Sequence, residues 1–218
     1  MSDAVTIVGF GPSADAVVPF AKGDVWVLAH DPQYTANATR LFEMHDMDLV
    51  VKYRRNFKER LATLAEFIPV YTQKPEPWLT HNRVYPLTEV TDMLGMDYFQ
   101  CSIAYMVALA ILEEFDEMTI AGVDLVSSKY AAQRPNLEWL IGHAQARGID
   151  VHIPDWSEIL RYDPRGGLPG DRRGTLEYPT RYGYAPTNIV KGEYHKELPG
   201  MEDQHAAVKE AMNVEVLP

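Results

Sequence analysis

The sequence predicts an α/β fold with a mostly parallel sheet, helices on both faces and an irregular C-terminal extension. Three observations predict it. Short apolar, β-branched segments alternate with segments of helical spacing from residue 4 to residue 154. The apolar segments lack alternating polar residues, as is typical of strands covered on both faces. Beyond about residue 161 the composition changes to Gly, Pro, Arg and Tyr without a sustained period.

The expected elements follow from hydrophobic spacing. Strands are predicted at residues 4–10, 25–30, 41–46, 68–73, 117–125 and 149–154. Apolar residues at helical spacing predict helices over 54–66 and 135–148, and a nearly all-apolar run predicts a buried helix over 101–115. Ser102 is well placed to be the N-cap of that helix. Residues 74–100 are expected to form a loop with a short helix near 88–94.

One α/β domain over 1–161 is therefore expected, followed by an irregular extension over 162–218 that ends in a short helix near 201–212. The extension combines aromatic and basic side chains, which occur in base-stacking surfaces and, more often, in protein interfaces. We expect it to serve as a packing or oligomerisation arm. The side chains concerned are Arg172, Arg173, Tyr178, Arg181, Tyr182 and Tyr184.

Composition excludes several classes of function. The chain has 218 residues, a formal net charge of −11 and one cysteine, Cys101. The charge disfavours broad binding to nucleic acid, which depends on Lys and Arg. A single cysteine allows no intramolecular disulfide, and no apolar stretch approaches the roughly 20 residues that span a bilayer. With no basic region before the first apolar run, we expect an unexported cytoplasmic protein without a membrane segment.

The turn after the first predicted strand is the leading ligand-site candidate. The stretch TIVGFGPSADAV changes from strand to helix at Gly9, Gly11, Pro12 and Ser13. Glycines permit close backbone approach and Pro12 suits a helix start, so the turn is expected to cradle a phosphate. The alternative is that the turn binds no ligand and is only a tight strand-to-helix connection.

A second interpretation of this turn is a dinucleotide fingerprint. Gly9, Gly11 and Ala14 fit G-x-G-x-x-A, with Asp31 following to hold a ribose. Pro12 is unusual inside such a turn, and Pro19 shortens the following helix. An oxidoreductase therefore ranks behind the other hypotheses.

Polar residues at other strand ends form a second set of candidates, because carboxyl ends of parallel strands line one crevice. Asp124 can hold a ribose hydroxyl or a metal, or can cap the next turn. His30 and Asp31 follow the second strand, where a nucleotide is commonly bound, although Asp31 also fits a turn. His45 and Asp46 offer an acid/base or metal pair, with a solvated loop end as the favoured interpretation.

Two longer motifs resemble a known fold group. The loop GFGPS closes the first strand, and CSIAYMVALAILEEFDEMTIAGVDL joins a Ser-initiated apolar helix to a strand ending in Gly122, Val123 and Asp124. This pattern resembles bacterial sialyltransferases of the lipooligosaccharide type and proteins related to 6-hydroxymethylpterin diphosphokinase. It is also similar to uncharacterised phage-encoded proteins. The implied fold is Rossmann-like.

The resemblance to the sialyltransferases implies that the glycine loop and Ser102 contact a cytidine nucleotide sugar. It further implies that a tyrosine near Tyr130 binds the phosphate and that a histidine, here His152, is the general base. Gln133 and Arg134 occupy the neighbourhood of the usual second tyrosine, and Arg134, which precedes a proline and so is expected just outside the helix, is expected to reach a phosphate. His152 otherwise fits a structural histidine.

The resemblance to the diphosphokinases implies magnesium at Asp124 and Asp46.

The leading hypothesis is a nucleotide-sugar-dependent glycosyltransferase acting on a small-molecule nucleotide ligand. The alternatives are an ATP-dependent diphosphokinase with magnesium at Asp124 and a non-catalytic binding protein on the same fold.

Overall fold

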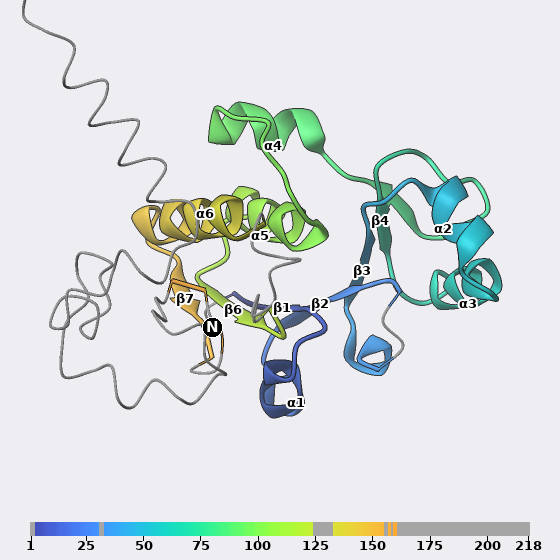
Figure 1. Ribbon diagram of the computed structural model, residues 1–218, viewed down its shortest axis with the longest axis horizontal. Coiled ribbons are helices and arrows are strands. Elements are labelled where there is room, and N and C mark those ends of the chain that lie inside the picture. Colours follow the sequence, from blue (N-terminus) through green and yellow to red (C-terminus); the bar gives the residue numbers. More distant parts are fainter. Residues whose placement is uncertain (1–2, 31–32, 124–132, 155–156, 158, 161–218) are drawn as a thin grey trace, which may run out of the picture. The chain divides into compact units, whose positions relative to one another are not determined.

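The computed structural model describes residues 3–30, 33–123, 133–154, 157 and 159–160. These residues form one seven-stranded sheet, whose order along the sheet is β5-β4-β3-β2-β1-β6-β7 (Figure 1). Every adjacent pair is parallel, as the sequence predicted for most of the sheet. The strands are β1 (Ala4–Val8), β2 (Asp24–Leu28), β3 (Arg40–Glu43), β4 (Val70–Thr72), β5 (Asn82–Val84), β6 (Glu117–Ala121) and β7 (Asp150–His152).

Helices cover both faces of the sheet, which makes the fold α/β and Rossmann-like. α5 and α6 lie over one face and α1 lies over the opposite face (Figure 1). The helices are α1 (Ser13–Val17), α2 (Met47–Tyr53), α3 (Phe57–Leu64), α4 (Leu87–Leu94), α5 (Ser102–Leu112) and α6 (Arg134–Ala146), with short 3₁₀ turns η1 (Val18–Phe20) and η2 (Thr35–Asn37).

The strands bury both of their faces because alternate side chains point to opposite sides of a sheet. In β2, Trp26 and Leu28 pack with the α5 and α6 face, and Val25 and Val27 pack with α1 and α3. This double burial explains why the central strands are continuously apolar.

α5 is the most deeply buried helix of the described residues, with eight of its eleven residues buried. Met106 and Leu109 pack in the same cluster as Ile7 of β1 and Ile120 of β6. The apolar run thus holds the two central strands in place from one side.

The structure corrects three expectations about elements. The helix expected over 54–66 begins at Phe57, after Asn56 adopts a left-handed conformation with φ of 57°. A separate helix, α2, precedes it. The segment expected to be a loop contains β5, whose Arg83 and Val84 are exposed, so this edge strand has no apolar signal.

The residue expected to cap α5 is also different. Cys101 occupies the N-cap position without a side-chain capping bond, and Ser102 is the first helical residue.

The extension over 162–218, with its expected helix and its aromatic and basic side chains, lies outside the described residues. The predicted domain boundary therefore stays a prediction.

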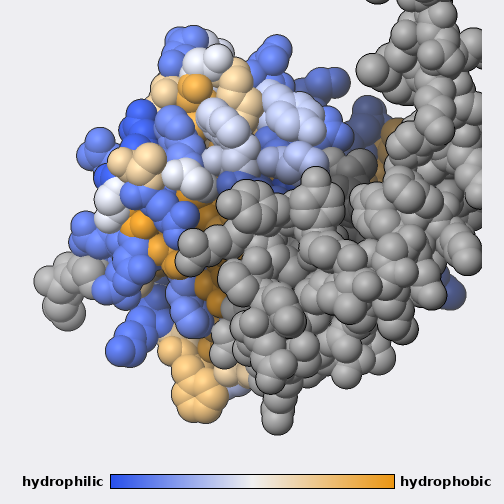
Figure 2. All heavy atoms as spheres, turned by 60° about the vertical axis from the view of Figure 1, so that its left-hand side comes forward, coloured by the Kyte–Doolittle hydropathy of each residue, from blue (hydrophilic) through white to orange (hydrophobic). Residues whose placement is uncertain are grey.

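No helix in the described part of the chain is long and apolar enough to cross a membrane. On the face drawn in Figure 2, the described atoms are mainly hydrophilic, with smaller hydrophobic areas between them.

Candidate functional site

The strand order reverses direction at β1. Strands β2 to β5 follow one another on one side of β1, whereas β6 and β7 lie on the other side. In open parallel sheets, ligands bind beyond the carboxyl ends of the strands at such a switch point. The residues that follow β1 and β6 therefore border the expected crevice.

The loops after β1 and β6 are joined by three hydrogen bonds. The Gly9 amide donates to the Ala121 carbonyl at 2.8 Å, and the Gly11 amide donates to the Gly122 carbonyl at 2.6 Å. The Gly122 amide in turn donates to the buried Oγ of Ser13 at 2.7 Å. The two motifs that carry the family resemblance thus lie against each other.

Glycine is required at this contact. A Cβ at Gly9 would lie 2.4 Å from the Gly122 carbonyl oxygen, and a Cβ at Gly122 would lie 2.4 Å from the Gly9 carbonyl oxygen. Gly122 also has φ of +69°, which L residues rarely adopt.

The expected phosphate cradle is therefore corrected in one respect. The amides of Gly9 and Gly11 donate to the protein's own backbone, so they are not available to an anion. Ser13 is buried and accepts the Gly122 bond, whereas Pro12 is exposed at the start of α1. The turn's contact with a nucleotide stays a prediction.

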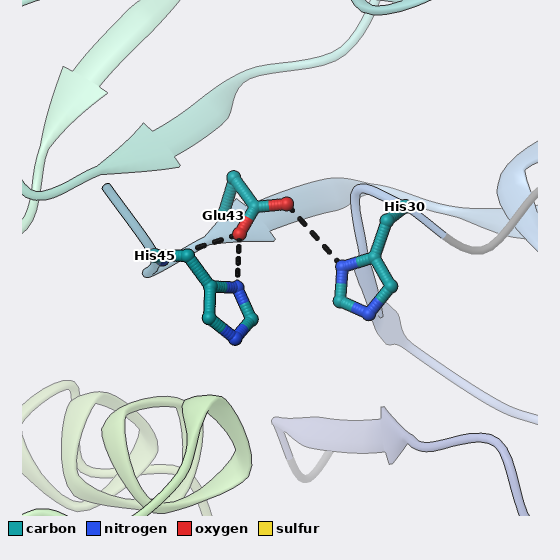
Figure 3. A group of neighbouring side chains, drawn as sticks. All are labelled: His30, Glu43 and His45. Carbon is teal, nitrogen blue, oxygen red and sulfur yellow. Dashed lines mark hydrogen bonds and ion pairs between the residues drawn. The ribbon is translucent and has the colours of Figure 1, made fainter. Parts of the chain in front are cut away.

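A histidine–glutamate–histidine group lies at the neighbouring strand ends. His30 follows β2, Glu43 ends β3 and His45 comes two residues later (Figure 3). His45 Nδ1 lies 2.5 Å from Glu43 Oε1, and His30 Nδ1 lies 3.3 Å from Glu43 Oε2. The His45 amide also donates to Glu43 Oε1 at 3.2 Å. One carboxylate thus holds two imidazole rings.

Burial and neighbouring charges determine the protonation state of Glu43. The Glu43 side chain has no exposed surface, and burial alone would raise its pKa. The hydrogen bonds and positive charge of His30 and His45 outweigh burial and lower the pKa of Glu43 to about 2. The hydrogen bond to Glu43 also raises the pKa of His45, against burial and the nearby charge of Arg54. Glu43 is therefore a carboxylate at neutral pH, and each Nδ1 donates to it.

An exposed aromatic ring covers one side of the group. Phe10, between the two loop glycines, is 57% exposed, and its ring centroid lies 4.7 Å from that of His30. The His30 and His45 rings are 5.7 Å apart in an edge-to-face arrangement. The ends of β1, β2 and β3 thus contribute one continuous set of rings around Glu43.

The same three residues have the composition of a metal site. One ligand atom from each of His30, Glu43 and His45 lies within 4.8 Å of the others. Magnesium prefers an all-oxygen set, which this group does not offer. Asp46, expected to hold magnesium, caps α2 by accepting the Leu49 amide at 3.2 Å, and its expected partner Asp124 lies outside the described residues.

The remaining predicted residues do not join this group. Arg134 Nε donates to Glu138 Oε1 at 2.7 Å within α6, so a neighbouring carboxylate already binds this guanidinium. Ser102 is half-buried at the start of α5. His152 is exposed at the end of β7 and pairs in register with Thr119, two residues before the end of β6. Asp31 and Tyr130 lie outside the described residues.

Sequence reasoning missed Glu43 and did not connect His30 with His45. The signal that could have found the group is spacing. Glu43 is a lone carboxylate between the apolar residues Phe42 and Met44, and His45 follows at i+2, on the same face of an extended chain. A charged residue inside an apolar strand is seldom buried without a partner.

Comparisons with known proteins give a similarity of fold. The sequence matches no protein-family model and no curated protein. Among solved structures, sialyltransferase CstII from Campylobacter jejuni with cytidine-5'-monophosphate shares 12% identity at a TM-score of 0.46, over 70% of this chain and 79% of that chain. An α-2,3-sialyltransferase from the same organism, in apo form, shares 12% identity at a TM-score of 0.46, over 82% and 79%. Identities and TM-scores of this size give no information about the activity of this chain.

Proposed function

We propose that this protein is a nucleotide-dependent transferase that moves a sugar from a nucleotide donor to a hydroxyl group of an acceptor. The observation that carries the proposal is the reversal of strand order between β1 and β6 at the carboxyl edge of a parallel sheet. The two motif loops touch at this point, and a charged side-chain group lies at the next two strand ends.

The position of Phe10 supports nucleotide binding. Its ring is exposed beside the crevice, and aromatic rings at such places stack on nucleobases. The flanking Gly9 and Gly11 are tied to the backbone after β6, so the ring is held in a defined place before a ligand arrives.

The His30–Glu43–His45 group supports transfer. In the reaction a bond forms between the acceptor oxygen and the anomeric carbon, and the bond from that carbon to the phosphate oxygen breaks. The acceptor's proton passes to solvent, and the departing phosphate carries the electron pair. Stabilising that developing negative charge is the main task of such a site. Nδ1 of His45 is bonded to Glu43, which raises the pKa of this histidine, so the donor suited to the phosphate is the second N–H of the protonated ring, at Nε2.

A ligand panel tests the proposal. The full-length protein is mixed with CMP, UMP, UDP, GDP and their nucleotide sugars, with a chelator for the binding measurements and without one for turnover, and separately with ATP and magnesium. Binding is measured by calorimetry and thermal shift, and turnover by release of free nucleotide. We expect one nucleotide class to bind and its sugar conjugate to be consumed.

The other outcomes contradict the proposal in distinct ways. No binding at millimolar concentration removes the nucleotide site. Binding of ATP and magnesium alone favours the diphosphokinase alternative. Binding without any turnover, across a panel of sugar acceptors, favours a non-catalytic binding protein.

A further inference from the structure

We propose that His30, Glu43 and His45 bind one divalent first-row transition-metal ion of the Zn²⁺ class. The inference deepens the proposed function, because it places a cation at the same carboxyl edge where the nucleotide is expected. It rests on the three side chains themselves and does not depend on the identity of the nucleotide.

The donor set selects the class of ion. Two imidazole nitrogens and one carboxylate form a set that suits zinc and related ions, whereas magnesium and calcium prefer oxygen donors. Three protein ligands are also the usual number where a fourth position stays open to water or substrate. The group therefore has the composition of a reactive site more than that of a closed structural one.

The distances require little rearrangement. Zinc bonds of about 2.0–2.2 Å in a tetrahedron place ligand atoms roughly 3.3 Å apart. In the structure Glu43 Oε2 and His30 Nδ1 are already 3.3 Å apart, and Glu43 Oε1 and His45 Nδ1 are 2.5 Å apart. These two contacts use different oxygens of Glu43, and the ligand atoms of the three residues lie within 4.8 Å of one another. The His45 pair must therefore open and the two imidazoles must close on the ion, and the His45 side chain is 57% exposed and able to move.

Binding needs no redox step. Each imidazole now carries a proton on Nδ1, where it donates to Glu43. When Nδ1 turns its lone pair to the ion, that proton passes to solvent, and the ring is left with one proton, on Nε2. The buried carboxylate then balances part of the ion's charge, so the ion replaces two hydrogen bonds as the partner of Glu43.

An approach route lies beside His45. A small cavity is lined by His45, Asp46, Asp48 and Glu76, and Lys74 also lines it. Three carboxylates around such an opening favour cations over anions. The net charge of −11 acts in the same direction over longer distances.

The bound ion would serve the proposed transfer. An ion held by His30, Glu43 and His45 has a position left for a phosphate oxygen of the donor. There it acts as a Lewis acid on the charge that develops as the sugar leaves. This would supply the charge stabilisation that the Gly9 and Gly11 amides, which donate to the backbone, cannot supply.

Metal binding is measured directly, without nucleotide. Untagged full-length protein is stripped with a chelator, dialysed and titrated with Zn²⁺ by calorimetry and with Co²⁺ by visible absorption. We expect one ion per chain and a Co²⁺ spectrum typical of nitrogen and oxygen ligands. Mg²⁺ and Ca²⁺ are expected to bind at least about 100-fold more weakly than Zn²⁺.

Two variants locate the site. His45→Ala removes an exposed ligand and leaves Glu43 bonded to His30 and to the backbone amide of residue 45, and Glu43→Gln keeps the shape of the buried side chain; the folding of both variants is checked by circular dichroism. Both are expected to weaken Zn²⁺ binding about 100-fold or more and to abolish the Co²⁺ spectrum. His81→Ala, which removes another exposed imidazole, is the matched control and is expected to bind as the wild type does.

Failure of this inference differs from failure of the proposed function. A wild type that binds no Zn²⁺, or variants that bind it unchanged, overturns the metal site even if nucleotides bind in chelator. Stronger binding of Mg²⁺ than of Zn²⁺ overturns the ion class. Stoichiometric Zn²⁺ binding lost in both variants supports the site even if no nucleotide binds.

Discussion

At the scale of single residues, the organising group is Glu43 with its two imidazoles. A buried carboxylate is costly unless hydrogen bonds and charge compensate it, and here His30 and His45 provide both. The sequence predicted polar strand ends at this edge, including His30 and His45. It could not predict their partner, because one isolated Glu in an apolar strand does not reveal which side chains the neighbouring strand brings near.

Phe10 gives the residue-scale prediction for ligand binding. Phe10→Ala is expected to weaken nucleotide binding about tenfold or more, because stacking of a base on an aromatic ring contributes about 1–3 kcal/mol. Phe10→Tyr should keep most of the affinity.

The control is Phe20→Ala, since Phe20 is 80% exposed in the same segment but lies in η1, after the turn. Titration calorimetry with the nucleotide found in the panel measures all three variants. Equal affinity of Phe10→Ala and wild type would remove the ring from the site.

Ser13 gives a second residue-scale prediction, this time of stability. Ser13→Ala leaves the Gly122 amide without its buried acceptor, which costs about 1–3 kcal/mol. The free energy of unfolding, measured by chemical denaturation, should fall by that amount. A change within error would mean that water or a shifted backbone replaces the hydroxyl.

At the scale of elements, the contact between the loops after β1 and β6 decides how closely the two central strands approach. The sequence predicted these strands and the apolar helix α5, because double burial leaves a strong signal. It did not predict β5, whose exposed residues carry no pattern, or α2, whose seven residues are too few for a clear period.

The element-scale prediction compares glycines. Gly9→Ala is expected to destabilise the fold by about 2–3 kcal/mol, because the new Cβ would overlap the Gly122 carbonyl oxygen. Gly142→Ala is the matched control. Gly142 is exposed within α6 and has open space around it, so alanine should stabilise the helix by up to about 1 kcal/mol. Thermal and denaturant unfolding test both, and destabilisation of equal size in the two variants would contradict the close contact.

At the scale of the whole described domain, the two edges of the sheet have different tasks. Arg40 begins β3 at the amino edge, where its guanidinium contacts Glu113 at 2.6 Å and Asp24 at 3.3 Å and lies over the Trp26 ring. This network ties β2 and β3 to the end of α5. The carboxyl edge instead gathers the histidines and the exposed phenylalanine.

Because Arg40 lies at the amino edge, its substitution is expected to change stability without changing ligand binding at the carboxyl edge. Arg40→Met is expected to lower the free energy of unfolding by about 2 kcal/mol, because partly buried charged hydrogen bonds are lost. Nucleotide and Zn²⁺ affinities should stay within about twofold of wild type, since Arg40 lies at the opposite edge. Calorimetry after confirming the fold by circular dichroism is the measurement, and a tenfold loss of affinity would contradict the division.

The sequence also predicted the overall architecture, since alternation of strands and helices leaves few topologies for a parallel sheet. It could not show which backbone groups of the glycine turn are already bonded within the protein. Glycines after a first strand are typical both of phosphate-binding loops and of close contacts between loops. In the structure, Gly9 and Gly11 form a close contact with the loop after β6.

Hydrogen exchange with mass spectrometry tests most directly whether nucleotide binds at the carboxyl edge. With CMP or another nucleotide from the panel at saturating concentration, peptides covering residues 9–13, 28–30 and 43–49 are expected to exchange more slowly. Peptides covering residues 22–24 at the amino edge should be unchanged. Protection confined to the amino edge, or absent from all three carboxyl-edge peptides while the nucleotide is bound, would contradict the account.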